Sequence, residues 1–82
     1  MRILKTHSVD HEGNDCWIYE SFTIVSSFET LFFVHHVKVT GWAGENYMTT
    51  TEIDDNEHLK RMLEHGDYDL SEETINYLCN FE

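Results

Sequence analysis

Apolar and polar side chains alternate along much of the first two thirds of the chain. Between residues 30 and 40, the odd positions from Leu31 to Val39 fall on one face of an extended segment, and the even positions form a mixed second face. A period of two is typical of a strand in a sheet with one buried side. Similar segments rich in aromatic and β-branched residues predict strands over 2–9, 16–25, 30–40 and 47–53, with a first polar turn over 10–15.

The period changes to that of a helix at Asp54. Asp54 is expected to cap a first helix, with Glu57 three residues later in the capping-box position. The apolar stripe that follows predicts a helix over 54–65. Gly66 is expected to end this helix in the left-handed conformation that glycine adopts readily.

A second helix is predicted over 71–81. Ser71 is expected to cap it, and Glu72 and Glu73 lie in its first turn, where carboxylates complement the helix dipole. Strands followed by helices favour an α+β fold, here one domain (1–82) with an antiparallel β-meander of three to four strands followed by two short helices packed on one face. The core is expected to draw on Ile3, Ile18, Phe22, Ile24, Leu31, Phe33, Val37, Leu59, Leu63, Ile75 and Leu78.

The charge of the chain is strongly negative and unevenly distributed. Sixteen acidic residues stand against five Lys and Arg, a net charge of -11 with His neutral. Residues 1–51 hold six acidic and three basic residues, a balance of -3, whereas 52–82 hold ten and two, a balance of -8. Nucleic acid and anionic membranes are not expected as direct ligands, because phosphate groups are bound by clustered Lys and Arg. Such a field attracts basic proteins, although net charge also serves solubility alone.

The candidate partner-binding residues are acidic and aromatic. Carboxylates spread along helices approach the spacing of phosphates along a nucleic-acid strand, and aromatic side chains with a polar group are common interface anchors. The same residues also suit structural roles, since helix caps and a solvated helix face use carboxylates and aromatic residues often line the rim of a core. The candidates are Glu52, Asp54, Asp55, Glu57, Glu64, Asp67, Asp69, Glu72, Glu73, Trp42, Tyr47 and Tyr68.

Catalytic and metal-binding patterns are weak. The sequence contains no nucleophile elbow, phosphate-binding loop, HExxH or CxxC motif, so no catalytic residue, cofactor or metal is predicted and an enzyme is not expected. The nearest approach to a metal site is His7, His11 and Asp15, with Cys16 beside them. Cys16 and Cys79 are expected to be reduced thiols, with a bridge between them as the alternative.

The small size, the acidity and the α+β order together resemble the small acidic inhibitors encoded by phages and other mobile elements, including anti-CRISPR proteins and DNA mimics. The resemblance covers the whole chain and rests on size, charge and composition, with no residue motif. It implies an inhibitor that occupies the basic nucleic-acid-binding surface of a host defence complex of the CRISPR type, a protein or ribonucleoprotein, and blocks DNA binding. No apolar run has signal-peptide or membrane-span length, so the expected location is the cytoplasm, that of the host if phage-encoded.

Two other classes of function stay open. One is an intracellular binding module, such as an acidic antitoxin that neutralises a basic toxin. The other is a small metal-binding or enzymatic domain. Salt-dependent binding separates the inhibitor and the antitoxin from the metal-binding or enzymatic domain, and the identity of the partner separates the inhibitor from the antitoxin.

Overall fold

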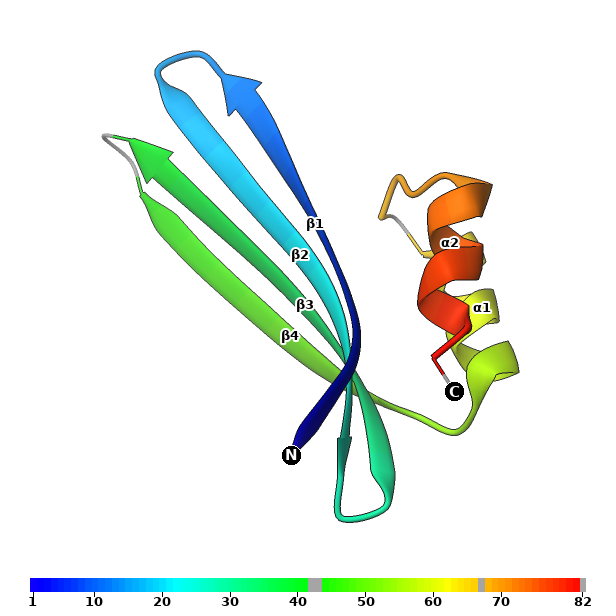
Figure 1. Cartoon of the computed structure of the whole chain (residues 1–82). Coiled ribbons are helices and arrows are strands. Elements are labelled where there is room, and N and C mark those ends of the chain that lie inside the picture. The colour runs from blue at the N-terminus through cyan, green and yellow to red at the C-terminus, as the bar shows by residue number, and fades with distance from the viewer. Residues whose placement is uncertain (42–43, 67, 82) are drawn as a thin grey trace.

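The computed structural model describes residues 1–41, 44–66 and 68–81. Four antiparallel strands form one sheet in the order β1-β2-β3-β4, and two helices follow (Figure 1). This arrangement confirms the predicted α+β meander with two helices. The elements are β1 (Arg2–Gly13), β2 (Cys16–Ser27), β3 (Thr30–Gly41), β4 (Glu45–Ile53), α1 (Asn56–His65) and α2 (Glu72–Cys79).

The first hairpin is longer than predicted. β1 continues to Gly13, so most of the segment predicted as a turn, 10–15, belongs to the strand and pairs with the start of β2. Polar side chains do not prevent this pairing, because the ladder is made by backbone groups and both faces of the sheet reach solvent near its tip. The turn itself consists of Asn14 and Asp15, and Asp15 has a φ of 60°, which Asp tolerates better than most residues.

The second hairpin turns through two residues that are poorly suited to it. Ser27 pairs with Thr30, which leaves Phe28 and Glu29 as the loop. Both have positive φ, 52° and 68°. A two-residue turn with positive φ at both positions is usually built from Asn and Gly, because a side chain with a bulky Cβ is strained there. The Phe28 side chain is fully exposed, so no burial of its ring offsets this strain.

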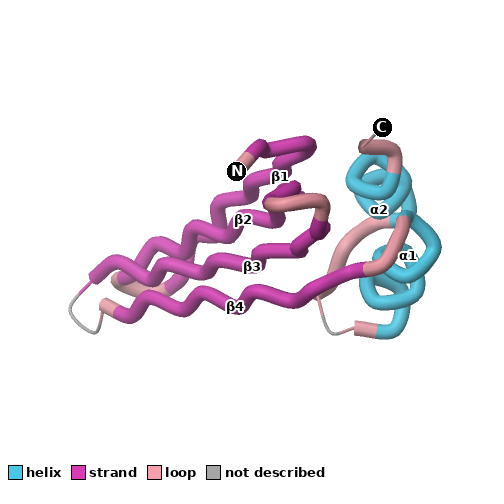
Figure 2. Tube along the Cα trace, turned by 90° about the horizontal axis from the view of Figure 1, so that it is seen from below, coloured by secondary structure: helices cyan, strands magenta, loops and turns pink. Residues whose placement is uncertain are grey.

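The two helices cover one end of one face of the sheet (Figures 1 and 2). Alternate side chains of the central strands, including Phe22, Ile24 and Phe33, point toward the helices and are buried. We call this the helix side. The opposite side, here called the open face, carries Val25, Phe32, Val34, Met48 and their alternate neighbours, and neither helix packs on it. Neither helix has the length and apolar character needed to cross a membrane, within the described residues.

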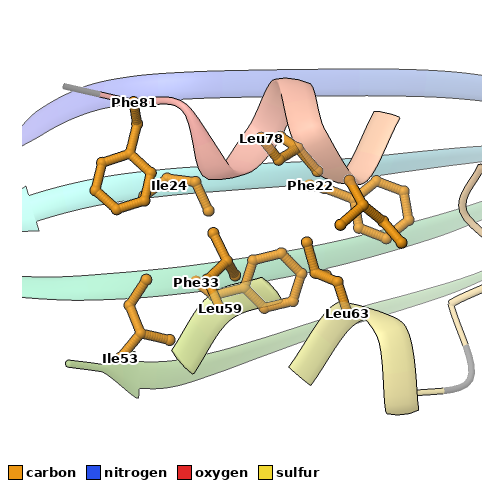
Figure 3. Packing of buried hydrophobic residues seen from close by; sticks show 9 residues of the cluster. Phe22, Ile24, Phe33, Ile53, Leu59, Leu63, Leu78 and Phe81 are labelled. Atoms are coloured by element: carbon orange, nitrogen blue, oxygen red, sulfur yellow. The ribbon is translucent and has the colours of Figure 1, made fainter. Parts of the chain in front are cut away.

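A single cluster of apolar side chains joins the sheet to the helices (Figure 3). Phe22 and Ile24 of β2 and Phe33 of β3 meet Leu59 of α1 and Leu78 of α2, and all five are at most 1% exposed. Burying a side chain of this size contributes about 1.5–3 kcal/mol, so these contacts dominate the stability of a small domain.

The predicted core is partly corrected. Ile3 is 62% exposed, because a register irregularity between Ile3 and Lys5 interrupts the alternation of β1 and pairs Ile3 with Val25 on the open face. Ile18 and Val37 are only half-buried, since they lie on the helix side but nearer the first hairpin turn than the helices reach. Ile53 and Phe81, which the pattern did not select, are buried in the cluster.

The helix starts are set by side-chain caps. The cap of α1 is Asp55, and the prediction of Asp54 was wrong by one residue: the Asp55 carboxylate accepts a hydrogen bond of 2.9 Å from the backbone N–H of His58. Asp54 instead donates its own backbone N–H to the His58 ring. The predicted cap of α2 is confirmed, because the hydroxyl oxygen of Ser71 accepts from the first turn.

Gly66 ends α1, but not in the predicted left-handed conformation. Its φ is -82°, so the backbone there is extended. Steric crowding explains why a glycine is needed at this position, because a Cβ here would lie 2.6 Å from the carbonyl oxygen of Met62 and 2.4 Å from the ring of Tyr68. The chain therefore leaves α1 so close to Tyr68 that only glycine fits.

The strained second turn generates the first prediction. The double substitution Phe28→Asn and Glu29→Gly should raise the free energy of unfolding by about 1–2 kcal/mol, because Asn and Gly both tolerate positive φ. Urea denaturation followed by circular dichroism measures the change. The control is Phe28→Ala, which removes the same exposed ring and keeps the strain. Equal stabilisation by both variants would contradict the role of backbone strain.

Candidate functional site

The helices α1 and α2 together form what we call the helix layer. The acidic candidates fall into two groups at opposite ends of it. Asp54, Asp55 and Glu57, the α1 acidic group, lie where β4 passes into α1 and line one shallow hollow of about 350 Å³. α2 runs back in the opposite direction to α1 (Figure 1), so its start lies at the other end of the layer. The ten residues of α1 span about 15 Å, which sets the approximate distance between the two ends.

The second group surrounds the start of α2. Asp69, Glu72 and Glu73, the α2 acidic group, are all exposed, but each borders a different hollow and they do not converge on one point. Of the other acidic candidates, Glu52 lies near the end of β4 and Glu64 in the last turns of α1, and both are exposed. Asp67 lies outside the described residues.

Within 1–41, 44–66 and 68–81, the exposed carboxylates form no ion pair with Lys or Arg. Among the described residues the three ion pairs all use histidine: Glu20 with His11 and His35, and Asp54 with His58 at 3.6 Å. One of the few basic groups is engaged otherwise, because Lys5 Nζ lies 4.1 Å from the centre of the Tyr77 ring. The negative field of the helix layer is therefore directed to solvent.

The aromatic candidates occupy different environments. Tyr47 is 55% exposed on β4, and its hydroxyl donates a hydrogen bond to the Glu45 carboxylate. This hydrogen bond, with the nearby negative charge and slight burial, raises the pKa of Tyr47. Tyr68 is half-buried, and its ring packs edge-on against Phe22 and Phe33 as part of the core rim. Trp42 lies outside the described residues.

A polar cluster that sequence reasoning missed lies on the helix side of the sheet. The Glu20 carboxylate pairs with His35 Nε2 at 2.7 Å and with His11 Nε2 at 3.3 Å, from the two strands that flank β2. Glu20 and His35 are both about one-fifth exposed. The His35 ring stacks on Phe22 with 4.9 Å between centroids and meets Tyr68 edge-on. The sequence feature that could have revealed this cluster is the period of two, which places Glu20 on the same face as Phe22.

The cluster borders a hollow of about 450 Å³ under the segment that joins the helices. Its lining includes His7, His11 and Glu20 from the sheet and Asp69 and Ser71 from the joining segment. The residues that come nearest to a metal site in the sequence, His7, His11, Asp15 and Cys16, form no such site, because no group of three or more His, Cys, Asp or Glu in the described part of the chain has metal-binding geometry. Among the polar groups of this hollow, His11 bonds to Glu20 and Ser71 bonds to Thr74.

The two cysteines are free thiols. Both are half-buried, Cys16 at the first hairpin turn and Cys79 at the end of α2. Burial raises the pKa of the Cys79 thiol, with a smaller lowering by the positive charge of Lys60 and a further raising by Glu64. A raised pKa suits a structural thiol, since nucleophilic cysteines have lowered values.

Comparison of the chain with protein-family models, with curated proteins and with solved structures gave no match.

The Glu20 cluster generates the second prediction. Glu20→Ala should lower the free energy of unfolding by about 1–3 kcal/mol, because it leaves the half-buried His35 ring without its acceptor. Urea denaturation at pH 7 measures the loss. Glu12→Ala is the matched control, since Glu12 is exposed on the neighbouring strand and should change stability by at most about 0.5 kcal/mol. An equal loss in both variants would show that the cluster adds no specific stability.

The Cys79 environment generates the third prediction. Because its pKa is raised in the folded state, the neutral thiol is favoured, and the resulting stability is present at neutral pH and lost as pH rises through the folded pKa. The rate at which iodoacetamide alkylates Cys79 should therefore begin to rise at a higher pH in the folded chain than in urea. Mass spectrometry measures this rate across a series of pH values. The pH at which the alkylation rate of the folded chain is half-maximal should be higher in Lys60→Gln and lower in Glu64→Gln. The opposite order would refute the assigned causes.

Proposed function

We propose that this protein is an acidic binding protein whose helix layer occupies the basic nucleic-acid-binding surface of another protein or ribonucleoprotein, and so blocks DNA binding. The observation that carries the proposal is the excess of exposed carboxylates over Lys and Arg in the helical part of the chain. The described carboxylates between Glu52 and Glu73 are all exposed, and none pairs with Lys or Arg.

The arrangement of the charge supports a groove-shaped partner. The α1 acidic group and the α2 acidic group lie roughly 15 Å apart at the two ends of a short layer, with the exposed side chains of Lys60 and Arg61 on the helix between them. A partner that carries two lines of Lys and Arg, as the walls of a DNA-binding groove do, matches two separated negative groups better than a single point of charge. A CRISPR-type effector is the specific partner class in this proposal.

Electrostatic attraction of this kind acts mainly on the association rate. Opposite charges raise the rate of encounter, and the effect weakens as salt shortens the Debye length to about 8 Å at physiological ionic strength. A single rim carboxylate contributes only about 0.2–1 kcal/mol, so single substitutions are a poor test. Groups of three are the smallest informative change.

The fourth prediction compares two sets of substitutions that remove the same charge. Asp54→Asn, Asp55→Asn and Glu57→Gln together should weaken binding to a CRISPR effector–guide complex about tenfold, mostly through a slower association rate. Asn at position 55 keeps the cap, because Asn and Asp cap helices equally well. The control is Asp10→Asn, Glu12→Gln and Asp15→Asn, at the first hairpin tip away from the helices. It should bind as the natural chain does.

Binding is measured by biolayer interferometry at several salt concentrations, with circular dichroism as the folding check. Duplex target DNA is added as a competitor, and it should displace the chain. If effector complexes of several types fail to bind, the CRISPR part of the proposal is wrong. A partner captured from host lysate then tests the remainder. Binding to it that is independent of salt, of DNA and of the helix-layer substitutions would overturn the acidic mechanism as well.

A further inference from the structure

The open face of the sheet holds an apolar groove that the fold leaves uncovered. The groove has a volume of about 510 Å³ and is lined by side chains from all four strands. Val25 lies in it and is only 6% exposed, although it belongs to no part of the core beneath the helices. Ile3 on edge strand β1 and Met48 on edge strand β4 also line the groove, and they are 62% and 71% exposed. A buried centre between exposed apolar edges marks an interaction surface.

The groove carries almost no charge in a strongly acidic chain. Among the described residues, its lining includes no Asp, Glu, Lys or Arg side chain. Its polar members are small hydroxyl residues such as Ser21 and Thr23, together with His36. A basic partner would find no opposite charge here, so this surface and the acidic helix layer suit different partners.

We propose that two copies of this chain pack open face to open face as a two-fold symmetric dimer. A groove that is apolar, free of Asp, Glu, Lys and Arg, and built from the same residues in both copies is matched in hydrophobicity by a second copy of itself. The exposed Ile3 and Met48 side chains of each copy then pack over the central groove of the other, with the sheets about 10 Å apart. This inference does not depend on the proposed inhibitory function.

The size of the face is sufficient for a stable interface. Strands of 12 residues are about 40 Å long, and four strands about 4.8 Å apart present roughly 700 Å². A standard protein interface buries about 800 Å² on each partner, so the groove together with the polar and charged positions around it on the open face approaches that size.

Charge repulsion does not prevent this pairing. The helices lie on the opposite side of the sheet (Figure 2), so both acidic groups of each copy face outward in the dimer. Strand register also places Asp10, Glu12 and Glu52 on the open face around the groove, with Lys38 as one positive charge among them. The repulsion between these carboxylates in the two copies is screened by salt. Dimerisation should therefore strengthen as salt rises, whereas binding of the helix layer to a basic partner should weaken.

The test uses two neighbouring residues of β4 that point to opposite sides of the sheet. Met48 lines the groove on the open face, and Thr49 is exposed on the helix side. Met48→Glu and Thr49→Glu add the same charge one residue apart on an edge strand. The mass of the full chain and of each variant is measured by sedimentation velocity from about 1 μM to about 1 mM, a range that covers dimers of moderate affinity.

The natural chain should form a dimer, tightened by salt. Met48→Glu should raise its dissociation constant at least tenfold, whereas Thr49→Glu should change it less than threefold. A chain that is monomeric at every concentration would overturn the proposal. Equal weakening by both substitutions would also overturn it, because that result indicates pairing through the β4 edge. A dimer unaffected by Met48→Glu would place the interface elsewhere. Circular dichroism confirms that both variants fold.

Discussion

The difference in length between strands and helices governs this structure. β1, β2 and β3 have 12 residues each and reach about 40 Å, whereas α1 and α2 have 10 and 8 residues and reach only about 15 Å and 12 Å. Two helices of this length cannot cover one face of the sheet, and they leave the other face bare. The apolar core is therefore confined to one end of the molecule, and most of the sheet meets solvent or a partner.

The Glu20 cluster lies at the border between the covered and uncovered parts of the helix side. Phe22, one alternate position further along β2, is fully buried under the helices, while Ile18 on the other side of Glu20 is half-buried. A carboxylate is tolerated at this border because His11 and His35 supply its hydrogen bonds and solvent still reaches it. Tyr68, from the segment that joins the helices, packs at the same border, where its ring contacts both Phe22 and His35.

The sequence predicted what depends on local pattern. The period of two over 30–40 and the aromatic and β-branched residues of the other segments identified all four strands, and the helical period with Ser71 as a cap identified both helices. What depends on register or on close approach was missed. The pairing of Glu20 with His35 requires knowing how β2 and β3 align, and the reason for Gly66 is the position of the Tyr68 ring. Ile3 was assigned to the core because an apolar residue in a strand does not reveal which face it occupies when both faces carry apolar side chains.

The separation of charged and apolar surfaces links the two proposed interactions. The carboxylates of the helix layer and the groove of the open face lie on opposite sides of the sheet, so one molecule can use both at once. In a dimer built on the open face, the two acidic layers point away from each other. A single groove of a partner can then contact the acidic layer of only one copy. The second copy therefore adds no affinity for that groove, because both layers cannot bind it at the same time. Under the two proposals together, such a dimer would present one acidic layer to each of two partner molecules.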